Sequence, residues 1–290
     1  MTSRPNRRYR TAAGTARRQP RVRRASGGLT PTRSAAILAM LIALGALFGL
    51  ATTSAFGFRT LDVEGALLTP VEAVRSAAAI EPGTNLVGLA TEPIAARIRE
   101  LTPVRDVAVS VGLPDTLRIA VTERRPIVIW QTGGVRYAVD DSGLLFAVVG
   151  ADPGGPTESI PVVIDERADA AGLGVRSTLD PVILDAATRI ASLTPAQIGS
   201  HASALTVRIT VKNGFTVSSG PDGWLAIFGF YGTSQRTPEL IPGQVQSLTA
   251  VLAKGEDRMD EIVLADTSAG TYTLKPTPRP SAKASQSAAP

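Results

Sequence analysis

The hydrophobic pattern divides the chain into one long apolar run and many short alternating segments. Residues 34–58 contain no charged side chain and lie between Arg33 and Arg59. A helix of this length spans roughly 37 Å, enough to cross a hydrocarbon core of about 30 Å. The centre of the run has no polar face, so it suits lipid better than the interior of a small domain. We therefore predict a transmembrane helix over residues 34–58.

The charges beside this run predict its orientation. Ten arginines and no acid precede it, and the first acid, Asp62, follows it. Because positively charged flanks stay in the cytoplasm, we predict that residues 1–33 are a disordered cytoplasmic tail and that the C-terminal part is extracytoplasmic. A cleaved signal peptide, cut near Ala55, is the alternative. The run is longer than the roughly 7–15 residues of a signal h-region, which favours an uncleaved anchor.

After the apolar run, the pattern predicts a β-α-α-β-β order, and hence a small α+β layer. Residues 59–65 alternate as a strand. Thr69-Pro70-Val71-Glu72 has the sequence of a capping box at a helix start. A second helix is predicted over residues 91–101, and a hairpin over residues 107–111 and 117–122. A sheet of this kind leaves an edge strand to which a partner strand can add.

From residue 124 the pattern predicts a mainly antiparallel β domain with two helices, and the fold class is α+β. Asp180-Pro181 is typical of a capped helix start, and Asn213-Gly214 of a type I′ hairpin turn. Trp130 and Trp224 lie inside strand patterns and are expected in the core rather than as exposed anchors. The predicted strands are 127–130, 135–139, 144–149, 205–211, 215–217, 224–228 and 261–266, with a continuation at 271–274. The predicted helices are 181–193 and 243–254, and residues 275–290 are predicted to be disordered.

The composition argues against catalytic chemistry. The chain has no cysteine, which excludes disulfides, thiolate metal sites and cysteine nucleophiles. The single histidine, His201, lies in a polar stretch typical of a loop, and Asp140-Asp141 is typical of a turn between strands. No nucleophile elbow, zinc-protease or P-loop motif is present. We therefore predict a protein that is not an enzyme, with no catalytic residue, cofactor or metal site.

The net charge of +5 comes from the tail, because the chain beyond it has 20 basic and 25 acidic residues. Nucleic-acid binding by the folded part is therefore not expected. We predict that the tail is an unstructured topology determinant, with contact to anionic lipid or nucleic acid as the alternative.

Several short motifs follow one another between residues 63 and 146. They are Val63-Glu64-Gly65, Gly83-Thr84-Asn85-Leu86, Pro103-Val104, Leu113-Pro114-Asp115-Thr116-Leu117, and Glu123-Arg124-Arg125-Pro126 with Trp130 after it. Together with the basic tail, the single span and the β-α-α-β-β module, their order resembles the FtsQ/DivIB family, which are bitopic cell-division proteins. The resemblance implies a POTRA domain at residues 59–123 and an FtsQ-type β domain at residues 124–274. It is looser after Phe146, although Ile160-Pro161-Val162-Val163 is similar to the family's L-P-x-V.

The resemblance also implies a function and a partner. A member of this family is a scaffold of the divisome in the inner (plasma) membrane at the division septum. It binds single-span coiled-coil proteins of the FtsB/DivIC and FtsL types and links them to septal peptidoglycan synthesis. The terminal strand of its β domain takes the FtsB-type partner by strand addition. By resemblance this site corresponds to Ile262, Val263, Leu264, Ala265 and Asp266, with Tyr272 as an apolar anchor; a buried core strand is the alternative.

Glu123-Arg124-Arg125-Pro126 is expected to form the domain junction. Pro126 cannot donate to a strand ladder, so it ends the strand, and the charged residues can pair across the junction. A partner-binding role for this segment is the alternative. For the whole chain, the other functions are a POTRA-containing transport or assembly component, a membrane-anchored cell-wall enzyme, and an exported soluble binding protein.

Overall fold

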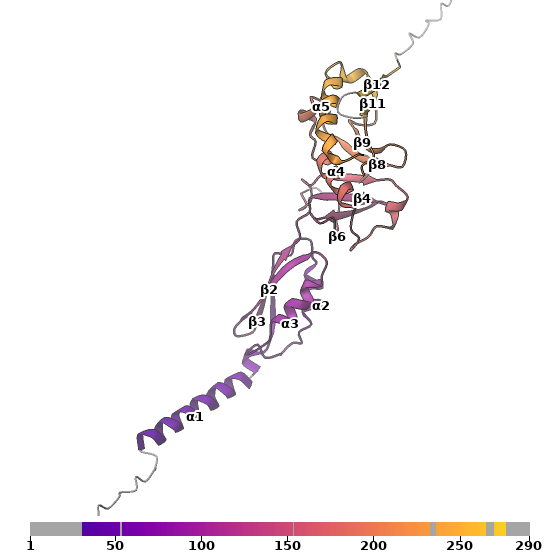
Figure 1. Cartoon of the computed structure of the whole chain (residues 1–290). Coiled ribbons are helices and arrows are strands. Elements are labelled where there is room, and N and C mark those ends of the chain that lie inside the picture. The colour runs from indigo at the N-terminus through magenta and orange to yellow at the C-terminus, as the bar shows by residue number, and fades with distance from the viewer. Residues whose placement is uncertain (1–30, 53, 153, 233–235, 265–269, 277–290) are drawn as a thin grey trace, which may run out of the picture. The chain divides into compact units, whose positions relative to one another are not determined.

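The computed structural model describes residues 31–52, 54–152, 154–232, 236–264 and 270–276 (Figure 1). The chain divides into two units, Met1–Thr52 and Thr53–Pro290. In the first unit, helix α1 (Pro31–Thr52) is long and apolar enough over Pro31–Gly49 to cross a membrane. Residues 1–30 of the predicted tail lie outside the described residues, whereas residues 31–33 already belong to α1.

The predicted span of residues 34–58 is not one helix. Helix α1 ends at Thr52, and Ser54–Phe56 form a short 3-10 helix, η1. The amide of Phe58 donates to the carbonyl of Thr84 at 2.8 Å, and its carbonyl accepts from Gly83 at 2.9 Å. The Phe58 side chain packs against the core of the domain that follows. Lipid-facing and core-packing residues are equally uncharged, so the pattern alone could not separate the end of the helix from the start of the domain.

The first domain of the second unit has the predicted β-α-α-β-β order. Its elements are β1 (Thr60–Glu64), α2 (Val71–Ala78), α3 (Glu92–Arg99), β2 (Val104–Gly112) and β3 (Thr116–Glu123). The sheet order is β1-β3-β2, with β1 parallel and β2 antiparallel to the central strand β3. The alternation of β3 turns Leu117, Ile119 and Val121 towards the core residues of α2 and α3. Both β1 and β2 are therefore edges of this sheet.

The predicted capping box at Thr69 does not form. Helix α2 begins at Val71 after Pro70, and no side chain caps it. The hydroxyl of Thr69 has no partner among the described residues, while the Thr69 amide donates to the Glu123 carboxylate at 2.6 Å. Glu72 instead lies 3.4 Å from Arg75 in an exposed pair. The Thr69 amide, which Glu72 would bind in a capping box, is thus bound by the Glu123 carboxylate from 54 residues away.

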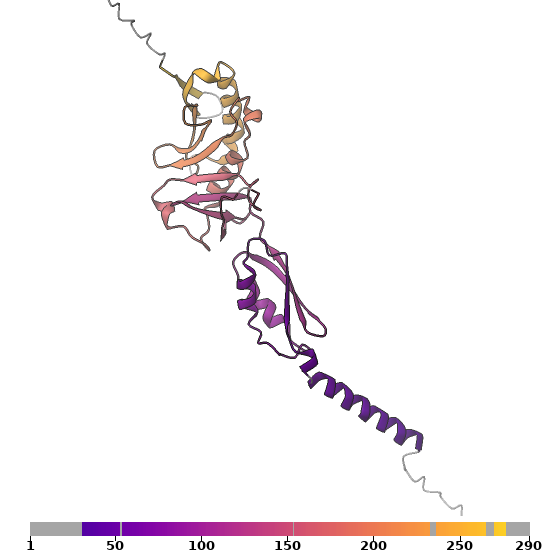
Figure 2. The same cartoon turned by 180° about the vertical axis from the view of Figure 1, so that it is seen from behind.

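The second domain is a nine-stranded sheet with the order β12-β11-β10-β9-β8-β7-β4-β5-β6. Helices α4 (Pro181–Ala191) and α5 (Ile241–Leu252) pack on one face of it (Figures 1 and 2). Its strands are β4 (Val128–Thr132), β5 (Val135–Val139), β6 (Leu145–Val148), β7 (Val162–Asp165), β8 (Thr206–Thr210), β9 (Gly214–Ser218), β10 (Leu225–Gly229), β11 (Met259–Leu264) and β12 (Gly270–Leu274). Most neighbours are antiparallel; the parallel pairs are β4–β7, β7–β8 and β10–β11.

Several local predictions for this domain are confirmed. The Asp180 carboxylate accepts from the amides of Val182 at 2.8 Å and Ile183 at 3.3 Å, so it caps α4. Trp130 and Trp224 are both buried in the core between the sheet and the helices. Asp140-Asp141 form the turn between β5 and β6, and His201 lies in an exposed loop.

Three predictions in this domain need correction. Asn213-Gly214 is not a type I′ turn: Thr210 pairs with Gly214, and Asn213 lacks the positive φ that a type I′ turn requires. Strand β7 is absent from the predicted strands, although it pairs in parallel with both β4 and β8. The predicted disorder from residue 275 begins too early, since the Lys275 amide donates to the Arg258 carbonyl at 2.9 Å.

Candidate functional site

Strand β11, which the sequence indicated as the docking strand, has a neighbour on each side. Ile262 is aligned with Ala226 of β10 and with Tyr272 of β12. The side chains of Ile262 and Leu264 are buried in the main core, and Val263 is half-buried. Ala265 and Asp266 lie outside the described residues. No partner strand can therefore add to β11 while the sheet is intact.

The free edge at this end of the sheet is β12, the segment that was expected to be only a continuation of β11. The Lys275 amide points towards the β11 side, where it donates to the carbonyl of Arg258, the residue just before β11. Because amide directions alternate along a strand, the amides of Tyr272 and Leu274 face away from β11, at the open edge. The Tyr272 side chain is 40% exposed, and the Lys254 ammonium lies 5.4 Å from its ring centroid. Among the residues that the structure describes, no strand pairs with the outer side of β12, which carries the exposed side chains of Tyr272 and Leu274.

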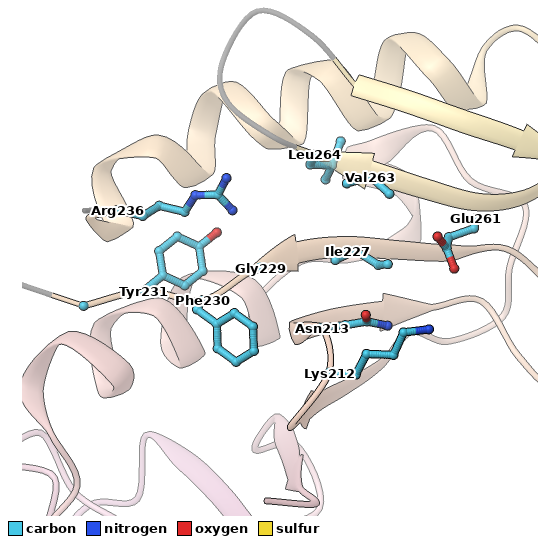
Figure 3. Close-up of a pocket in the computed structure, with 11 residues that line it drawn as sticks. Lys212, Asn213, Ile227, Gly229, Phe230, Tyr231, Arg236, Glu261, Val263 and Leu264 are labelled. Atoms are coloured by element: carbon cyan, nitrogen blue, oxygen red, sulfur yellow. The ribbon is translucent and has the colours of Figure 1, made fainter. Parts of the chain in front are cut away.

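An open groove of about 800 Å³ lies over β10 and β11, on the sheet face opposite α5 (Figure 3). Its floor includes Ile227 of β10 and Val263 of β11, which are register partners in the parallel pair. Lys212 borders it from the β8–β9 turn, and Phe230 is half-exposed at its side. The groove therefore combines an apolar floor with charged side chains at its border.

A largely buried carboxylate fixes the turn that leads into β11. Glu256 accepts hydrogen bonds from the Trp224 indole at 2.7 Å, the His201 amide at 2.8 Å and the Ser200 hydroxyl. Burial acts most strongly on Glu256 and opposes its ionisation, but the hydrogen bonds together outweigh it, so the pKa of Glu256 lies below its ordinary value. This carboxylate connects the loop before β8, the start of β10 and the start of β11.

At the domain junction, Glu123 binds backbone rather than another charge. Its carboxylate accepts from the amides of Leu67 at 3.0 Å, Leu68 at 2.9 Å and Thr69 at 2.6 Å. The Leu68 side chain packs against a small core cluster of the β domain that includes Phe146. Glu123 therefore holds the loop that carries an apolar contact between the two domains.

Arg124 forms the ion pair across the junction. Its Nη1 lies 2.8 Å from the buried Asp140 carboxylate, and its Nε donates to the Thr102 carbonyl at 3.0 Å. Burial opposes the ionisation of Asp140, but hydrogen bonds from Ser142, Arg124 and the Leu144 amide outweigh it and hold the pKa of Asp140 below its ordinary value. Arg125 and Pro126 follow in the linking segment, where Arg125 lines a cavity with Asp140.

Comparison with known proteins identifies the family. A family model for the POTRA domain, FtsQ-type, matches residues 56–124. The cell division protein FtsQ of Streptomyces coelicolor is 30% identical over 253 residues, which cover 81% of this chain and 92% of that protein. The chain belongs to the FtsQ family. The FtsQ of Chloroflexus aggregans is also 30% identical, over 67% of this chain and 75% of that protein.

The FtsQ-type match begins at residue 56, which agrees with the hydrogen bonds that place Phe58 in the POTRA domain. A third relative, the FtsQ of Mycolicibacterium smegmatis, is 30% identical over 63% of this chain, and the match spans only 59% of that protein. The chain therefore corresponds to nearly the whole of some FtsQ proteins and to little more than half of others.

The described residues of this FtsQ-family chain show no arrangement for nucleophilic catalysis. Ser200 and His201 both contact Glu256, but the serine hydroxyl donates to the carboxylate and not to the imidazole. A Ser-His-acid relay needs the histidine between the other two groups. Within the same residues, no group of three or more His, Asp or Glu side chains lies close enough to hold a metal ion.

Replacing Glu123 by glutamine is expected to destabilise this FtsQ-type POTRA domain by about 1–2 kcal/mol, because one amide oxygen cannot replace two charged acceptors for three N–H groups. Glu64→Gln is the matched control, since Glu64 is exposed on β1 of the same sheet. Hydrogen exchange of residues 67–69 in the full chain measures the effect. Equal protection of these amides in the two variants would contradict the role assigned to Glu123.

Proposed function

We propose that this FtsQ-family protein is a non-enzymatic, bitopic scaffold of the bacterial divisome. The residues before α1 form a cytoplasmic tail, α1 spans the inner (plasma) membrane once, and residues 59–274 form the extracytoplasmic POTRA and β domains at the division septum. The family membership, the apolar helix α1 and the ten arginines before it support this proposal. A fluorescent fusion at the N-terminus should give an uncleaved product and a band at midcell in dividing cells.

The partners in this proposal are single-span proteins of the FtsB/DivIC and FtsL types, which the scaffold links to septal peptidoglycan synthesis. An extended segment of the FtsB/DivIC-type partner adds to the sheet as a strand next to β12. The observation that carries this assignment is that β12 ends the nine-stranded sheet, whereas β11 has a strand on both sides. Tyr272 lies on this edge strand, and Ile262, Val263 and Leu264 support the site from the neighbouring strand β11.

Tyr272→Pro is expected to weaken binding of the FtsB/DivIC-type partner about tenfold or more, because it removes an outward-facing amide and obstructs the partner strand. The ladder between β12 and β11 does not use this amide, so the domain should stay folded. Tyr272→Val is the matched control: it keeps the amide and the strand propensity and removes only the aromatic ring. Affinity is measured with the purified full chain in nanodiscs and the partner's extracytoplasmic segment.

The two variants separate backbone recognition from side-chain recognition. If the partner binds by strand addition, the valine variant retains most of the affinity and the proline variant loses it. Equal affinity of Tyr272→Pro and the unmodified chain would refute docking at β12. Val263→Pro is a poor test, because it breaks the interior of the sheet and would abolish binding at any site on this domain.

A further inference from the structure

At one end of the POTRA domain, the segment that follows α1 lies beside two loops of the domain. The chain enters the sheet through residues 56–60, which are hydrogen-bonded on both sides. On one side the Leu86 amide donates to the Phe56 carbonyl at 2.9 Å, and on the other the Arg59 amide donates to the Asp115 carbonyl at 2.9 Å. We call residues 56–60, 83–88 and 112–116 the entry end of this domain.

Each loop of the entry end exposes a large apolar side chain. Leu113, in the β2–β3 turn, is 60% exposed, and Val87 is 43% exposed. Both loops are held by hydrogen bonds. The β2–β3 hairpin is paired up to Gly112 and Thr116, and the Asn85 side chain accepts from the Val87 amide at 2.8 Å. The entry end therefore presents two apolar side chains from loops that are held in place by hydrogen bonds.

The charges of the entry end offer no attraction for an anionic surface. Within these residues Arg59 and Asp115 carry the only charges, and on the adjoining face Arg118 lies 3.9 Å from Asp62. These charges sum to zero. Any membrane contact of this end must therefore come from burial of Leu113 and Val87 rather than from attraction to anionic headgroups.

The length of the chain limits how far this end can lie from a membrane. Helix α1 ends at Thr52, and Phe56 already makes a hydrogen bond within the POTRA domain. Four residues reach at most about 14 Å. The headgroup layer on each side of a bilayer is itself roughly 5–8 Å thick. If α1 spans the membrane, as the proposed function requires, the chain holds the entry end at the surface of the leaflet from which α1 emerges.

We propose that the entry end is a lipid-contact surface, in which Leu113 and Val87 insert into the interface of that leaflet. The POTRA domain then rests on the bilayer through two loops as well as through its covalent link. This contact would limit the rotation of the domain about the link, and so the directions in which the β12 edge can meet a partner. The inference rests on the membrane anchor of the proposed function, but not on the choice of β12.

The test uses the absence of cysteine in the chain, which allows single fluorescent labels. Leu113→Cys in the full chain is labelled with an environment-sensitive dye and reconstituted without any partner into nanodiscs with spin-labelled lipids. Val211→Cys is the control, since Val211 is 70% exposed in a turn of the β domain. Ile42→Cys, in the middle of α1, reports whether the helix is in the bilayer. We expect the dye at residue 113 to be quenched about twofold or more, equally with zwitterionic and anionic lipids, and the dye at residue 211 to be unaffected.

Each other outcome has a definite meaning. Strong quenching at residue 42 with equal, weak quenching at residues 113 and 211 would overturn the lipid contact and leave the membrane anchor intact. Leu113 would then be assigned to contact with a protein instead of lipid. Quenching at residue 113 with anionic lipid alone would overturn insertion by apolar burial. No quenching at residue 42 would refute the anchor itself, and the lipid contact with it. Val87→Cys, labelled in the same way, should repeat the result for residue 113.

Discussion

Gly65→Ala is expected to destabilise the POTRA domain by about 3 kcal/mol or more, one of the largest effects of a single methyl group in this protein. Gly65 has a φ of +80°, and an added Cβ would overlap the carbonyl oxygen of Val121 on the central strand β3. Since that oxygen belongs to the sheet backbone, it can move only if β3 moves. The close approach of β1 to β3 therefore requires glycine at this position.

Gly83→Ala in the same domain separates the overlap from the backbone conformation. Gly83 has nearly the same φ, +84°, but an added Cβ would meet no atom within 4 Å. Its substitution should cost only about 1 kcal/mol, the strain of a left-handed alanine. Hydrogen exchange of β3 amides in the full chain compares the two variants. Similar losses of protection would mean that strain alone, and not the contact with Val121, explains the glycine.

Glu256→Ala is expected to destabilise the β domain by about 3 kcal/mol, because it leaves the buried indole N–H of Trp224 and the hydroxyl of Ser200 without their acceptor. The tryptophan fluorescence of the full chain reports unfolding, since Trp130 and Trp224 both lie in this domain. Asp257→Ala is the control, as Asp257 is the exposed neighbour of Glu256. Equal unfolding midpoints for the two variants would contradict the structural role of Glu256.

The pH dependence of stability gives a second test of the same carboxylate. The pKa of Glu256 is lower in the folded protein than its ordinary value. It therefore stabilises the fold at pH values above the unfolded pKa of about 4.3, and this contribution is lost as the pH falls through the lower folded pKa. The stability difference between the unmodified chain and Glu256→Gln should shrink as the pH is lowered from about 5 to 3. A constant difference over this range would show that charge has no part in the role of Glu256.

Local signals in the sequence determined the elements of this protein well. The alternation of residues 117–122 and the spacing of Ile94 and Ile98 gave the hairpin and α3, because these periods depend only on neighbours within one element. The Asp180-Pro181 cap was equally clear, since its hydrogen bonds reach only two and three residues along the chain. The uncharged run gave a membrane-length helix, and the ordered motifs gave the family.

The candidate site depended on contacts between distant segments, which no local pattern records. Residues 259–264 and 270–274 are both strand sequences, and only the position of β11 between β10 and β12 shows which of them has a free edge. The Glu123 carboxylate likewise accepts hydrogen bonds from the amides of Leu67–Thr69, which lie 54–56 residues away. The local capping motif at Thr69 therefore does not form its hydrogen bonds. The sequence by itself determined most of the strands, the approximate positions of the helices and the family. The tertiary structure decided which of these two strands ends the sheet, because strand order depends on pairing between distant segments.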